Sequence, residues 1–98
     1  MKPEQVQKVL DGEAGVKAEG KGTYVIGEEI ELTVLLDMGQ EPLSVARVRR
    51  LTLQADLLTL ETYKGERVYT SASVRALKLS LSDAGKARGA GFLAPRDR

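Results

Sequence analysis

The fold of this chain is decided by the stretch Ile30-Glu31-Leu32-Thr33-Val34-Leu35-Leu36-Asp37-Met38. Apolar side chains occupy every second position from Ile30 to Met38, and most of the positions between them are polar. A period of two places one set of side chains on one face of a β-strand. We therefore predict a central strand over residues 30–38, whose apolar face must be covered by other strands.

Further short strands surround this one along the sequence. Their apolar and β-branched content predicts strands at Val16–Glu19, Thr23–Ile26, Leu43–Leu53, Leu57–Tyr63, Glu66–Thr70 and Val74–Ser82. Glycine-containing or polar turns separate most of them, with Lys64-Gly65 as the centre of a tight hairpin. The pattern predicts an all-β domain, a small antiparallel six-stranded barrel, with an immunoglobulin-like β-sandwich as the alternative.

The two ends of the chain have a different character. Pro3–Leu10 predicts a short helix, because Val6, Val9 and Leu10 follow helical spacing and Gly12 provides a stop. Residues 83–98 are glycine-rich and basic, which predicts a flexible tail unless Phe92-Leu93 docks. We expect one β domain over residues 1–82.

One predicted strand, Leu43–Leu53, breaks the alternation. Ala46 and Val48 share one parity, whereas Leu51 and Leu53 have the other. One extra residue at Arg49-Arg50 would restore a single apolar face, which is the pattern of a β-bulge. We therefore predict a bulge there, with the neighbouring arginines facing solvent.

The formal net charge of +1 conceals an uneven distribution along the chain. Residues 1–42 hold four lysines and nine acidic residues, a net charge of −5, whereas residues 43–98 hold eleven basic and five acidic residues, a net charge of +6. The two halves can pair inside the fold, pair between subunits, or present a basic face to an anionic partner. Ordinary solvated faces are the remaining explanation, and we hypothesise that the domain self-associates through opposite charges.

Composition argues against several classes of function. The chain has no cysteine and no histidine, so we expect no disulfide, no thiolate metal site, no cofactor and no enzyme activity. Gly15–Gly22 approaches a phosphate-binding loop, but Gly22 stands where that loop needs a hydroxyl residue, and strand-like residues follow. The sequence also has no secretory signal and no run of eighteen apolar residues, which predicts a cytoplasmic protein without membrane or metal partners.

The concentrated signal is a basic cluster at Arg47, Arg49 and Arg50. Guanidinium groups bind phosphate through paired hydrogen bonds, and a strand can present several of them at once. Charges at such positions also keep an exposed strand from pairing with another chain. We expect a non-catalytic interaction or assembly module whose partner is a protein or a second copy. The alternative is a binder of RNA, DNA or a cyclic dinucleotide through these three arginines.

Part of the chain resembles the later half of PilZ domains. The resemblance rests on the segments Asp11–Val16, Ile26–Leu32, Gly39–Leu43 and Ala46–Val48. It implies a β-barrel of the kind that grips cyclic di-GMP through a D-x-S-x-x-G turn and an upstream R-x-x-x-R. This chain has no arginine before Arg47, and its turn lacks the serine. The resemblance therefore implies a barrel that does not bind that nucleotide in the usual way.

The predicted central strand can be tested at two neighbouring positions, Val34 inside and Thr33 outside. Val34→Ala should lower the free energy of unfolding by about 1 to 3 kcal/mol, because it removes buried surface and leaves a cavity. In thermal denaturation, Val34→Asp should lower the melting temperature far more than Thr33→Asp. Equal shifts for the two aspartate variants would contradict the strand assignment.

Overall fold

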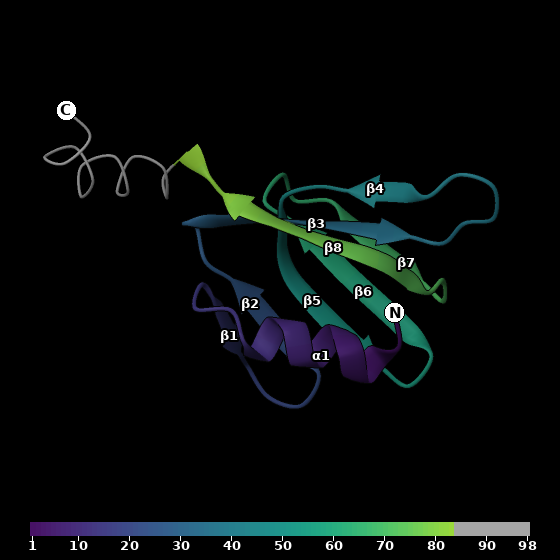
Figure 1. Ribbon diagram of the computed structural model, residues 1–98, viewed down its shortest axis with the longest axis horizontal. Helices are drawn as coiled ribbons and strands as arrows, with labels where there is room; N and C mark the ends of the chain where they lie inside the picture. Colours follow the sequence, from purple (N-terminus) through teal and green to yellow (C-terminus); the bar gives the residue numbers. More distant parts are fainter. Residues whose placement is uncertain (84–98) are drawn as a thin grey trace, which may run out of the picture.

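The computed structural model describes residues 1–83, which form one helix and eight strands (Figure 1). The elements in chain order are α1 (Pro3–Asp11), β1 (Val16–Ala18), β2 (Thr23–Ile26), β3 (Ile30–Leu36), β4 (Leu43–Val45), β5 (Val48–Gln54), β6 (Leu57–Thr62), β7 (Arg67–Thr70) and β8 (Val74–Leu81). The predicted β-rich domain with a short N-terminal helix is confirmed. The predicted tail over residues 83–98 lies, apart from Asp83, outside the described residues.

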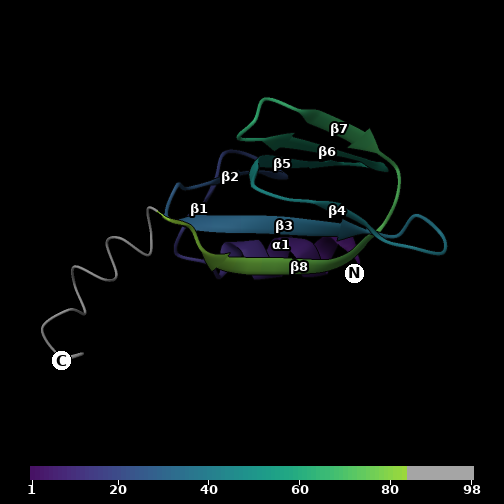
Figure 2. The same ribbon diagram turned by 90° about the horizontal axis from the view of Figure 1, so that it is seen from above.

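The strands form two antiparallel sheets that lie one above the other (Figure 2). One sheet has five strands in the order β1-β2-β5-β6-β7, and the other has three in the order β4-β3-β8. Within residues 1–83 no ladder of hydrogen bonds joins the two sheets, so the predicted closed six-stranded barrel is not confirmed. The layering agrees with the two-sheet alternative.

Strand β3 is the centre of the three-stranded sheet, as its alternation predicts. Leu32, Val34 and Leu36 are fully buried, whereas Thr33 is only half-buried on the other face. The strand ends at Leu36, earlier than predicted, and after one more backbone hydrogen bond, from Asp37 N–H to the Ser73 carbonyl, the chain enters the loop to β4. Met38 is consequently 54% exposed instead of belonging to the core.

The core lies between the two sheets and is closed on one side by α1. Pro3 opens the helix, and the Gln5 side chain accepts a hydrogen bond from the Lys2 backbone N–H at 2.8 Å. Val6 and Leu10, one turn apart, are fully buried. The helix packs against β1 and β8, which are edge strands of the two sheets (Figure 1). Each of these two buried side chains contributes about 1.5 to 3 kcal/mol of burial free energy.

The predicted strand over residues 43–53 is wrong in one respect, because it is two strands in different sheets. Strand β4 pairs with β3, and β5 pairs with β2 and β6. The chain crosses between the layers at Ala46-Arg47, where Arg47 has a left-handed backbone with φ 56°. The crossing buries both Val45 and Val48 but leaves Ala46 exposed. The prediction that Ala46 and Val48 share one face is therefore wrong.

The predicted bulge at Arg49-Arg50 is confirmed. Val48 pairs with Thr62, but Arg50 pairs with Glu61, so Arg49 is the extra residue on β5. The shift corrects the parity, because Val48 and Leu51 are then both fully buried.

The acidic and basic halves of the sequence are interleaved in the fold. The five-stranded sheet joins β1 and β2 from the acidic half to three strands from the basic half. Two ion pairs link the halves directly, Arg50 with Glu19 at 3.0 Å and Arg75 with Asp37 at 3.9 Å. Part of the charge asymmetry is therefore paired inside one chain, and self-association through opposite charges stays a prediction.

The β5–β6 hairpin contains a backbone conformation that its sequence does not favour. Its turn is Ala55-Asp56, and Ala55 has φ 45°. Asparagine or glycine is the usual residue at such a position, because the left-handed region costs other residues about 1 to 2 kcal/mol. Ala55→Asn should therefore raise the free energy of unfolding by about 0.5 to 1 kcal/mol, measured by urea denaturation.

The matched control is Ala46→Asn, since Ala46 is exposed and does not have a positive φ. That substitution should give no gain. Equal changes at the two positions would contradict strain at Ala55.

Candidate interaction surfaces

Two of the three predicted arginines lie together on the outer face of the five-stranded sheet. The Arg49 guanidinium is 3.0 Å from the Glu61 carboxylate, and the Arg50 guanidinium is 3.0 Å from that of Glu19. Both arginine side chains remain accessible, with 48% and 39% of their surface exposed. Exposed pairs of this kind contribute about 1 kcal/mol or less, so the two arginines stay available to a ligand.

Arg47 has a different environment. It precedes the bulge at the crossing between the sheets, and its backbone carbonyl accepts a hydrogen bond from the Tyr63 N–H at 3.0 Å. Its side chain lines a pocket of about 250 Å³ together with Glu28, Glu31 and Tyr63. Within the described part of the chain Arg47 forms no ion pair. The structure therefore brings Arg49 and Arg50 together on the outer sheet face, whereas Arg47 lies apart from them, in a pocket that Glu28 and Glu31 also line.

The outer face of the five-stranded sheet carries two rows of side chains that run across the strands. The strand registers place one row, the charged row, at Lys17, Val25, Arg50, Glu61 and Arg67. The row beside it, the hydroxyl row, consists of Thr23, Thr52, Thr59 and Tyr69. In the view of Figure 2 no described element covers this face. Sequence reasoning missed the rows, because they depend on the exact strand registers, and one of the pairings, β2 with β5, joins segments far apart in the chain.

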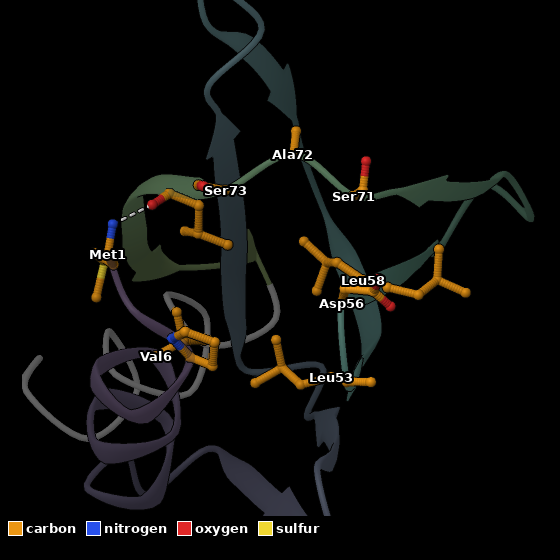
Figure 3. Close-up of a pocket in the computed structure, with 12 residues that line it drawn as sticks. Met1, Val6, Leu53, Asp56, Leu58, Ser71, Ala72 and Ser73 are labelled. Atoms are coloured by element: carbon orange, nitrogen blue, oxygen red, sulfur yellow. Dashed lines mark hydrogen bonds between the residues drawn. The ribbon is translucent and has the colours of Figure 1, made fainter.

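An apolar pocket of about 120 Å³ lies at one end of the two-layer structure (Figure 3). Its walls come from the start of α1, the β5–β6 turn and the linker between β7 and β8. The core residues Val6, Leu58 and Val74 line it from inside, and Asp56 and Ser73 contribute polar groups. The pocket therefore opens directly onto the hydrophobic core.

Large apolar side chains are exposed around this pocket. Leu57, which lines the pocket, is 40% exposed. Met1, which also lines the pocket, is 36% exposed. We call the pocket, together with its exposed wall residues Leu57 and Met1, the apolar end. The sequence alone gave no sign of it, because the walls come from segments far apart in the chain.

Tyr63 lines the same pocket as Arg47 and also forms a hydrogen bond with the five-stranded sheet. Its hydroxyl donates a hydrogen bond to the Ile26 carbonyl at 2.5 Å, which ties the end of β6 to the end of β2. Burial raises the pKa of the Tyr63 phenol, and the nearby Glu28 carboxylate raises this pKa further, while Arg49 opposes the shift. The neutral phenol is therefore the form that the fold favours.

The described residues form neither a carboxylate cluster for a metal ion nor a loop of the phosphate-binding kind. Over residues 1–83, no group of three or more carboxylates is placed to hold a metal ion. The one helix there is too short to cross a lipid bilayer. Gly22, in the loop that approaches a phosphate-binding pattern, packs against β5, and its carbonyl accepts a hydrogen bond from Leu53 N–H at 2.7 Å. A strand follows it instead of a helix, so this loop has a structural role.

Comparison with known proteins gives no relative on which to base a function. No protein-family model matches the sequence, and no curated protein or solved structure was found to match it. The resemblance to PilZ domains therefore stays a prediction.

Tyr63 provides a test of how this part of the structure depends on pH. Tyr63→Phe should lower the free energy of unfolding by about 0.5 to 1.5 kcal/mol at neutral pH, because it removes one hydrogen bond. A raised pKa means that the neutral phenol stabilises the fold below its ordinary pKa of 10.0 and that this contribution is lost as pH rises above it. The difference between wild type and variant in urea denaturation should therefore shrink above pH 10.0.

Tyr69→Phe is the control, because the Tyr69 hydroxyl forms no hydrogen bond within residues 1–83. It should leave stability unchanged at neutral pH. A Tyr63 difference that stays constant up to strongly alkaline pH would contradict the assignment.

Proposed function

We propose that this domain is a non-catalytic interaction module whose apolar end receives an apolar side chain from a protein partner. The observation that carries the proposal is the apolar pocket next to the core, with exposed Leu57 and Met1 in its wall. Solvent-exposed apolar surface that surrounds a hollow is typical of a binding site. In this proposal the module acts in the cytoplasm, since a chain without cysteine needs no oxidising compartment.

The size of the pocket suits one side chain. A dry apolar cavity of about 150 Å³ can hold a benzene-sized group. The pocket, at about 120 Å³, is therefore suited to one aliphatic side chain or a small ring. Burying such a group contributes about 1.5 to 3 kcal/mol, which a few hydrogen bonds at the rim would supplement. Asp56, Ser71 and Ser73 supply donors and acceptors for an incoming backbone.

The experiment that tests this proposal fills the pocket with a larger side chain of the domain itself. Ala72 lines the pocket and is half-buried, so Ala72→Leu should occupy the space that a partner side chain would take. A displayed library of random peptides selected on the wild-type domain should yield peptides that share one large apolar residue. These peptides should bind Ala72→Leu about ten- to a hundredfold more weakly, as loss of one buried side chain predicts.

Ala76→Leu is the control, because Ala76 is also half-buried but lies on the outer face of the three-stranded sheet, opposite Leu35. It should leave peptide affinity unchanged, and circular dichroism should show that both variants fold. Selected peptides that bind Ala72→Leu as well as the wild type would rule out the pocket as the binding site.

A further inference from the structure

Basic side chains are regularly spaced across the outer face of the five-stranded sheet. Lys17, Arg50 and Arg67 of the charged row lie on the first, third and fifth strands of the sheet order. Neighbouring strands are about 4.8 Å apart, so successive charges along this row are about 10 Å apart. Arg67 is well exposed, at 63% of its side chain. Such a row can meet separate phosphates along one extended backbone.

The hydroxyl row beside it ends in an accessible aromatic ring. Tyr69 pairs with Thr59 in the register of β6 and β7 and is 60% exposed. Thr59 in turn pairs with Thr52 on β5. The row of cations suits the phosphate backbone of a nucleic-acid strand, and the exposed ring beside it suits stacking with a base.

Glu61, an acidic member of the charged row, contacts two arginines on this face. Its two carboxylate oxygens contact Arg49 at 3.0 Å and Arg67 at 3.8 Å. One carboxylate cannot neutralise two guanidinium groups, so this site keeps a net positive charge. Glu61 is only 22% exposed in its side chain, whereas the two arginine side chains are 48% and 63% exposed, so both guanidinium groups stay accessible to a ligand.

We propose that this sheet face binds single-stranded nucleic acid, with phosphates along Lys17, Arg50 and Arg67 and a base stacked on Tyr69. The exposed ring favours an unpaired base over a duplex, whose bases already stack on one another. The combination of ring and spaced cations favours nucleic acid over an acidic protein. The proposal uses none of the residues of the apolar end, so each of the two proposed sites can be tested independently of the other.

The first test measures how binding depends on salt. Fluorescence anisotropy with a labelled oligothymidylate of about twelve nucleotides should give a slope of about −2 for log affinity against log salt, for three neutralised phosphates. The double variant Arg50→Gln with Arg67→Gln should reduce the slope to about −0.7, the value for one phosphate. Glu61→Gln should raise the affinity, because it removes the negative charge from the row.

The control is Arg75→Gln with Lys78→Gln, which removes the same charge from β8 in the other sheet. It should leave the slope of the oligonucleotide near −2. An equal loss from both double variants would overturn the proposal, since it would mean that only net charge matters. Absence of any oligonucleotide binding at low salt would overturn it as well.

The second test isolates the ring. Tyr69→Phe should keep the affinity for the oligonucleotide, and Tyr69→Ser should lower it about tenfold, as loss of one stacked base predicts. Polyphosphate, which has no bases, should bind the wild type and both Tyr69 variants equally. If Tyr69→Ser leaves oligonucleotide binding unchanged, the face binds polyanions in general, acidic proteins included, and the assignment to nucleic acid is wrong.

Discussion

The structure depends on covering the apolar face of β3. Leu32, Val34 and Leu36 have no access to solvent, and this requires a second layer of strands and a helix around them. A three-stranded sheet cannot supply that cover by itself, so the five-stranded sheet packs on it and α1 closes one side. The helix, about two turns long, would be marginal alone and gains its stability from the Val6 and Leu10 contacts.

Packing two sheets from one chain requires a crossing between them, and the crossing is where the backbone is strained. Arg47 has a positive φ at the passage from β4 to β5, and the Arg49 bulge follows at once. Ala55, the other non-glycine residue with a positive φ in the described part, lines the apolar pocket, as Arg47 lines the pocket beside Tyr63. Strained positions gather at binding sites in many proteins, which agrees with the placement of these two pockets.

The arrangement leaves two surfaces of opposite character. At the apolar end, buried core side chains line a pocket that is open to the surface. On the outer sheet face, Arg49 and Arg50 form ion pairs with Glu61 and Glu19, and both side chains stay accessible to solvent. A pocket selects by shape and burial, whereas the charged row selects by charge and spacing. The two proposed sites therefore differ in the chemistry of the partner that each would select.

The sequence by itself determined the features that depend on local periodicity. Alternation over residues 30–36 placed Val34 inside and Thr33 outside, helical spacing located α1, and a change of parity located the bulge at Arg49. The tertiary structure alone decided which sheet each strand joins and which side chains share a row. Lys17 and Arg67 belong to one row through four successive strand pairings. Three of these join consecutive strands, whose registers depend on their turns, whereas the pairing of β2 with β5 joins strands separated by β3 and β4 and follows from long-range packing that local periodicity does not encode.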